Sequence, residues 1–89
     1  MLSPYQWQQA AEAWLQSETQ DKLIAAPKCY ENALNWSKAE ECWRKLAKWD
    51  KVAKTCEQQG EKKWDDAIDA WLLAGNKLKA ANLLRKMGK

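Results

Sequence analysis

The amino-acid sequence predicts an all-α fold, in which about six short antiparallel helices stack as helical hairpins into an α-solenoid without a β-sheet. Two observations predict this fold. Tryptophan and alanine recur together at helical spacing, and the strong helix formers Ala, Leu, Glu, Gln and Lys dominate the 89 residues. No segment alternates β-branched residues with polar ones, and valine occurs once, so the sequence offers no candidate strand.

The repeat has a large, small, large pattern at offsets 0, 3 and 7, which lie on one face of an α-helix. Three copies carry two tryptophans each: Trp7, Ala10 and Trp14; Trp36, Ala39 and Trp43; Trp64, Ala67 and Trp71. Softer copies begin at Leu23, Trp49 and Leu78, so the units start near residues 7, 23, 36, 49, 64 and 78. Because one unit cannot bury its apolar face alone, we expect residues 1–89 to form a single helical-repeat domain, with most of the indoles in its core.

Capping residues indicate where the helices begin and end. Ser3 precedes Pro4 and lies three residues before Gln6, and Ser37 lies three residues before Glu40, so both serines are candidates for a capping box. Glycines at positions 60, 75 and 88 follow the last turns of three units, where glycine favours the left-handed conformation that ends a helix. We expect helices at about 4–17, 24–34, 37–47, 50–59, 65–74 and 77–87.

Pro27 interrupts the second unit. A proline inside a helix loses one hydrogen bond and clashes with the preceding turn, at a cost of about 3 kcal/mol. We therefore expect either a helix that starts near Pro27 or an irregular entry through residues 19–26.

The segment Trp64-x-x-Ala67-x-x-x-Trp71-x-x-Ala74-Gly75 resembles the second helix of a tetratricopeptide repeat. The run AWLLAGNKLKAANLLRKMG, residues 70–88, is similar to the short hairpins of clathrin-type, vesicle-coat and intraflagellar-transport solenoids. The resemblance covers roughly residues 23–88. It implies a solenoid of helical hairpins whose general task is to hold other proteins.

Composition excludes several classes of function. The chain has no histidine, which excludes Ser-His-Asp and Cys-His nucleophile systems and histidine metal sites. No run of about 18 apolar residues is present, so we expect no membrane span. The start of the chain lacks the basic and apolar regions of a signal peptide, and the cysteines are odd in number. We therefore expect a cytoplasmic protein whose thiols stay reduced.

Residues that could carry chemistry have simpler structural interpretations. Cys29, Cys42 and Cys56 could supply three thiolates to a zinc ion, but they recur at matching points of the repeat, as buried thiols would. The acidic run from Asp65 to Asp69 could hold magnesium, but it also fits the first turn of a helix. The three glycines are isolated, which excludes a phosphate-binding loop. We expect no enzyme, no cofactor, no metal and no catalytic residue.

The remaining expectation is a non-catalytic protein–protein interaction or scaffold module, an end or a fragment of a larger assembly. Trp49 has no ring seven residues later, and with Lys45 and Lys48 it is our candidate for the protein-binding surface. The alternative is RNA or single-stranded nucleic-acid binding through the basic strip at residues 38–54. A net charge of only +3 argues against that alternative.

Self-association is a further expectation, based on the uneven charge. Residues 1–21 carry −3 and the remainder of the chain carries +6. An acidic first helix could therefore meet a basic last helix in another copy. Simple variation of surface charge explains the same numbers.

Overall fold

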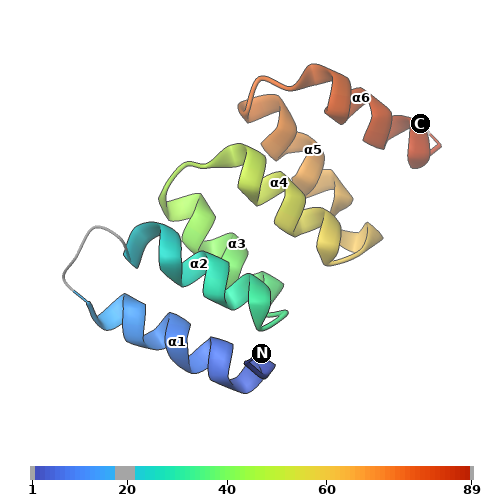
Figure 1. The fold of residues 1–89 in the computed structure, drawn as a ribbon. Helices are drawn as coiled ribbons and strands as arrows, with labels where there is room; N and C mark the ends of the chain where they lie inside the picture. Colours follow the sequence, from blue (N-terminus) through green and yellow to red (C-terminus); the bar gives the residue numbers. More distant parts are fainter. Residues whose placement is uncertain (1, 18–21, 89) are drawn as a thin grey trace.

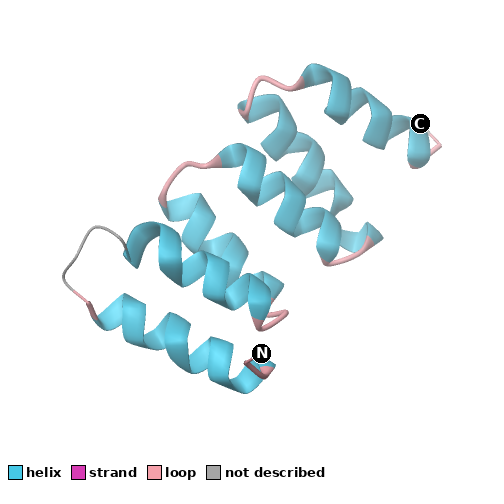
Figure 2. Ribbon diagram, viewed as in Figure 1, coloured by secondary structure: helices cyan, strands magenta, loops and turns pink. Residues whose placement is uncertain are grey.

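The computed structural model describes residues 2–17 and 22–88. All regular structure in these residues is helical, as Figure 2 shows, so the all-α prediction is confirmed for the part described. In chain order the helices are α1 (Pro4–Gln16), α2 (Lys22–Asn32), α3 (Trp36–Lys45), α4 (Trp49–Gln58), the 3₁₀ turn η1 (Glu61–Lys63), α5 (Trp64–Leu73) and α6 (Lys77–Lys86).

The helices pack in the order in which they occur in the chain. Each helix contacts the one before it and the one after it, and the described residues bring no more distant pair of α-helices together. The molecule is elongated, with extents of 42, 25 and 18 Å. Figure 1 shows α1 and α6 at opposite ends of this row, with the intervening helices running antiparallel to their neighbours. Such an arrangement leaves a groove between any two helices that flank a third.

The core follows the repeat. Ala39, Ala67 and the second tryptophans of two units, Trp43 and Trp71, are buried, the two rings being 2% and 3% exposed. The alanines allow neighbouring helices to approach closely, and the rings fill the space beside them. Burial of one indole contributes up to about 5 kcal/mol at ~25 cal/mol per Å². These two rings explain how helices of ten residues stay folded in so small a chain.

The other indoles are less buried than the repeat predicts. Trp7, Trp49 and Trp64 are half-buried and pack against the core. Trp14 is 37% exposed although it occupies the same place in its unit as Trp43. The expectation that the rings are core residues therefore holds in full for Trp43 and Trp71 and is wrong for Trp14.

Two predicted helix starts have different outcomes. At α1 the capping box is confirmed: the Gln6 backbone N–H donates to Ser3 Oγ at 3.3 Å, and the Ser3 N–H donates to Gln6 Oε1 at 2.9 Å. At α3 the prediction is wrong, because Ser37 lies inside the helix. Asn35 caps α3 instead, its Oδ1 accepting the Lys38 backbone N–H at 3.3 Å. The Glu40 side chain is thereby free to make the buried contacts described below.

The turns after α2, α3 and α5 share one geometry. Leu34, Ala47 and Gly75 have φ angles of 62°, 55° and 80°, in the left-handed region. In each turn the next backbone N–H donates to the carbonyl five residues earlier: Asn35 to Tyr30 at 2.9 Å, Lys48 to Trp43 at 3.1 Å and Asn76 to Trp71 at 2.9 Å. This 6→1 bond is the signature of a Schellman motif. The three hairpin turns are therefore built alike, although only one of them uses glycine.

The path around Pro27 differs from the expectation. α2 begins at Lys22 and contains Pro27, so neither a helix start near Pro27 nor an irregular entry over residues 22–26 is correct. Residues 18–21 of the predicted path lie outside the described part of the chain. The Pro27 ring is fully buried, and its burial offsets part of the cost of the missing hydrogen bond.

Candidate interaction surfaces

A groove with several basic side chains lies between α4 and α6, with α5 at its floor. Lys54 and Gln58 come from α4, and Lys79, Asn82 and Lys86 come from α6. Glu57, Trp71 and Leu83 complete the lining. Lys54 is far in the sequence from Lys79 and Lys86, and the packing of α4 and α6 on α5 brings the three lysines to one groove. We call this the α4–α6 groove.

The floor of the α4–α6 groove is held by two contacts of Trp71. Its Nε1–H donates to Glu57 Oε2 at 2.9 Å, and Lys79 Nζ lies 4.6 Å from the centre of its ring. The cation over the ring face adds an attraction of order 1 kcal/mol. Because the ring is 3% exposed, no flat indole face is open to solvent in this groove.

Similar residues occur one repeat earlier, around Trp43 of α3. Burial raises the pKa of Glu31 on α2, while the charges of Lys51 and Lys28 and the nearby Trp43 indole lower it in part. The Trp43 N–H makes no hydrogen bond of ordinary geometry within the described residues, although it lies near enough to Glu31 to affect that pKa. The same three residue types therefore recur one repeat apart. Glu31 on α2, Trp43 on α3 and Lys51 on α4 are followed by Glu57 on α4, Trp71 on α5 and Lys79 on α6.

A second groove lies between α1 and α3, with α2 at its floor. Its lining is mainly apolar, and charged side chains from α3 stand at the rim: Leu15, Ala26, Pro27, Tyr30, Cys42 and Leu46, then Lys38, Glu41 and Lys45. Lys45 Nζ and Glu41 Oε1 are 3.8 Å apart and both side chains are well exposed, so this pair contributes little to stability.

The predicted protein-binding residues surround the turn between α3 and α4. Trp49 is half-buried and packs against the core, and it lines neither groove. Lys48 is exposed at the start of α4, and its side chain makes no capping hydrogen bond. Lys45 lines the α1–α3 groove. The three residues are near one another in the chain but do not form one groove.

The basic strip at residues 38–54 is divided between surfaces. Lys38 and Lys45 line the α1–α3 groove, whereas Lys54 lines the α4–α6 groove. Arg44 is bound to the buried Glu40. The strip therefore does not present its charges in a single row.

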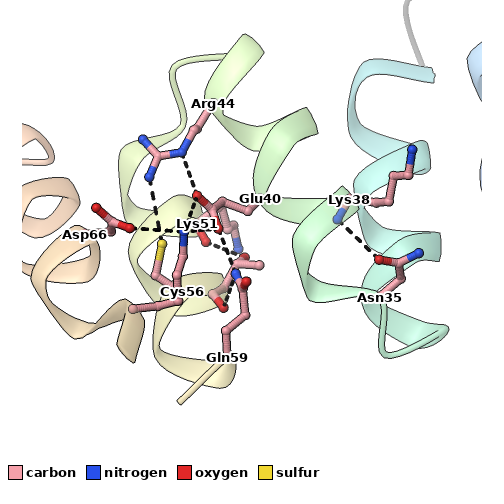
Figure 3. A network of polar contacts seen from close by, with 10 residues as sticks. Asn35, Lys38, Glu40, Arg44, Lys51, Cys56, Gln59 and Asp66 are labelled. Carbon is pink, nitrogen blue, oxygen red and sulfur yellow. Dashed lines mark hydrogen bonds and ion pairs between the residues drawn. The ribbon is translucent and has the colours of Figure 1, made fainter. Parts of the chain in front are cut away.

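A polar network surrounds the buried Glu40, and Figure 3 shows Arg44, Gln59 and Asp66 gathered around it from α3, the end of α4 and α5. The Glu40 carboxylate accepts hydrogen bonds from Arg44 Nε at 2.8 Å and Gln59 Nε2 at 2.7 Å. Lys63 Nζ lies 3.3 Å from Glu40 Oε1 and 3.0 Å from Asp66 Oδ2. Burial raises the pKa of Glu40, but the hydrogen bonds from Gln59, Arg44 and Lys63 and the charge of Lys63 outweigh it and hold the pKa below its ordinary value. The contacts of Glu40 with Gln59 and Lys63 tie α3 to the segment after α4, so this network stabilises the packing of these helices.

The thiols and the acidic run do not form a metal site within the described residues. Cys29 and Cys56 are buried and Cys42 is half-buried, and all three are free. Asp65 and Asp66 occupy the first turn of α5, where a carboxylate favours the helix dipole. Within residues 2–17 and 22–88, no three cysteine, aspartate or glutamate side chains are grouped so that they could hold a metal ion.

None of the described helices combines the length and the apolar character that crossing a bilayer requires.

Sequence reasoning missed the α4–α6 groove. One signal was present, because Lys51 and Lys79 are 28 residues apart, the spacing that also separates Trp43 from Trp71. Of these two lysines, Lys79 lies over the Trp71 ring in the groove. Comparison with protein-family models, with curated proteins and with solved structures found no match to this chain.

Proposed function

We propose that this chain is a non-catalytic protein interaction module, an α-solenoid of tetratricopeptide-like hairpins, and that its α4–α6 groove binds an acidic peptide segment of a partner. The observation that carries the proposal is the convergence of Lys54, Lys79 and Lys86 in one groove. Lysines positioned from two rigid helices attract carboxylates and increase the rate of encounter with an acidic partner.

The polar groups between the lysines support a peptide as the ligand. The amides of Gln58 and Asn82 can each donate to a peptide carbonyl and accept from a peptide N–H. An extended segment that enters the groove exposes these groups along its backbone. The groove therefore offers charge for acidic side chains and amides for the main chain.

Nucleic acid fits the same groove less well. Binding of single strands depends on aromatic faces on which bases stack, but the Trp71 ring is 3% exposed and Lys79 lies over it. RNA or single-stranded DNA is thus the alternative ligand, and the experiment below tests it directly.

The free thiols support a reducing compartment, and we infer that the module acts in the cytoplasm. Its place as an end or a fragment of a larger assembly belongs to the same proposal.

The test is a titration with a synthetic peptide rich in Glu and Asp, followed by tryptophan fluorescence and calorimetry. We expect binding that weakens with added salt and that falls at least tenfold in Lys54→Glu and Lys79→Glu. Lys45→Glu, which changes the same charge in the α1–α3 groove, is the matched control and should bind normally.

Two outcomes contradict the proposal. One is equal loss of binding in the Lys45→Glu control, which would mean that only net charge matters. The other is that an oligouridine binds more tightly than the peptide and loses affinity in the same two groove variants. The second outcome would assign the groove to nucleic acid.

A further inference from the structure

The two ends of the helical row are incompletely covered, and equivalent positions in the repeat show this. Trp14 on α1 matches Trp43 and Trp71, yet it is 37% exposed where they are 2% and 3% exposed. Ala10 matches Ala39 and Ala67, which are both 0% exposed, and Ala10 is only half-buried. In α3 and α5 these positions have a preceding helix nearby, and α1 has none within the described residues.

At the opposite end of the row, α6 also exposes apolar residues that a following helix would cover. Ala53 and Cys56 on α4 are both fully buried in the stack that α5 continues. The matching residues of α6, 28 positions later, are Ala81, which is exposed, and Leu84, which is 38% exposed. Ala80 and Leu83, on the side of α6 that stays covered, are buried. The exposed side of α6 therefore corresponds to the side of α4 that a following helix covers.

We propose that copies of this chain associate head to tail, with the exposed side of α6 in one copy packed on α1 of the next. The contact of α6 with α1 of the next copy would repeat the packing of α2 on α3 and of α4 on α5. Ala81 and Leu84 would lie against Ala10 and Trp14, in the manner of the interior interfaces. The contact does not require a ligand in the α4–α6 groove.

Charge favours a second copy as the occupant. Within the described residues, α1 holds one acidic residue, Glu12, and no base, while α6 holds four bases and no acid: Lys77, Lys79, Arg85 and Lys86. Opposite potentials on the two ends accelerate encounter and disfavour contact between like ends.

The geometry fixes the kind of assembly. The two contacting surfaces are different, so the interface is heterologous. A dimer therefore keeps one free α1 surface and one free α6 surface, to which further copies can bind. Association therefore continues past the dimer as concentration rises. A symmetric contact between two identical faces would stop at the dimer.

The test uses two variants that each block one end, measured by sedimentation velocity over a range of concentrations. Trp14→Arg places a cation opposite the basic α6, and Leu84→Glu places a charge in the apolar part of the contact. Each variant alone should associate at least tenfold more weakly than the unmodified chain. Both side chains are partly exposed in the single copy, so helix content by circular dichroism should stay unchanged.

Mixing the two variants gives the decisive measurement. Each variant keeps the surface that the other lacks, so an equimolar mixture should recover the association that each variant alone has lost. Leu73→Glu, at a site on α5 that is 62% exposed, is the control and should assemble like the unmodified chain.

Three results would overturn the assembly: an unmodified chain that stays monomeric at every concentration, one that stops at the dimer, or variants that do not rescue each other. Peptide binding by Trp14→Arg, read by calorimetry, separates this inference from the proposed function. Absence of assembly by the unmodified chain, with peptide binding intact, would contradict this inference alone. Absence of peptide binding, with assembly intact, would contradict the proposed function alone.

Discussion

The indole N–H of Trp71 donates to the Glu57 carboxylate at 2.9 Å, and this bond links α5 to the helix before it. The ring of Trp71 is almost fully buried, so the bond satisfies a polar group that water cannot reach. The matching indole of Trp43 has no hydrogen-bond partner among the described residues. Successive repeats therefore share the ring but differ in how its polar atom is satisfied.

Glu57→Ala should destabilise the chain by about 1–2 kcal/mol, because the Trp71 N–H would lose its acceptor while staying buried. Urea unfolding followed by circular dichroism measures this change. Gln58→Ala, next to it and exposed, should change the free energy of unfolding by less than about 0.5 kcal/mol. Equal effects of the two substitutions would show that the bond contributes nothing.

The hairpin turns offer a test of backbone strain. A non-glycine residue in the left-handed region costs about 1–2 kcal/mol, and Leu34 and Ala47 both occupy that region. Leu34→Gly and Ala47→Gly should each stabilise the chain by about 1 kcal/mol, even after the greater freedom of glycine in the unfolded chain is counted. Thermal unfolding should show a higher Tm for both.

Gly75 supplies the reciprocal variant. A methyl group added at Gly75 meets no atom within 4 Å, so the cost of Gly75→Ala comes from its φ of 80° alone. We expect a destabilisation of about 1 kcal/mol. If Gly75→Ala were neutral, the turn would be able to relax, and the gains expected at Leu34 and Ala47 would vanish as well.

The Glu40 network should make stability depend on pH. The folded pKa of Glu40 lies below its ordinary value of 4.5, so its contribution is complete at pH values above 4.5 and is lost as pH falls through the folded pKa. Glu40→Gln should cost about 2 kcal/mol at pH 7, because it removes charge-assisted hydrogen bonds.

The difference between the unmodified chain and Glu40→Gln isolates this effect. The pKa of Glu31 is raised by burial, which acts in the opposite direction, but Glu31 is present in both proteins and cancels. Urea unfolding at several pH values should therefore show a gap that is constant near neutrality and shrinks below pH 4.5. A gap that stays constant at acid pH would mean that Glu40 is not stabilised as the carboxylate.

Much of the fold could be predicted from the sequence because its strongest signals are local. The offsets of tryptophan and alanine define helices whose observed bounds lie within two residues of the expected ones for every helix. Ser3 and Gln6 formed their capping box because all of its atoms belong to one helical turn. The prediction at Pro27 was wrong. The sequence shows only the backbone cost of a proline inside a helix, and burial of the Pro27 ring offsets part of that cost.

The candidate surfaces could not be predicted, because they depend on which helices are neighbours in space. Trp14 and Trp43 have the same place in their repeat units, but Trp43 lies on a helix with a neighbour on each side, whereas α1 contacts α2 alone among the described helices. Lys54 and Lys79 meet in one groove because two different helices pack on α5. Residues 38–54 form a contiguous basic segment in the sequence, but the fold divides their lysines between two grooves.

The three thiols should react slowly in the folded chain. Burial, with the charge of Glu40, raises the pKa of Cys56 to about 11, and burial also raises the pKa of Cys29 and of Cys42. At pH 8 a pKa of about 11 leaves roughly one Cys56 in a thousand as the reactive thiolate, far below the fraction at an ordinary thiol.

Reaction with a disulfide reagent tests this expectation. The reagent should modify all three cysteines rapidly in urea. In the folded chain it should modify Cys42, the only half-buried one, before the other two. The Cys42→Ser variant should lose the faster phase and keep the slow one, and rapid modification of Cys56 in the folded protein would contradict its burial beneath α3 and α5.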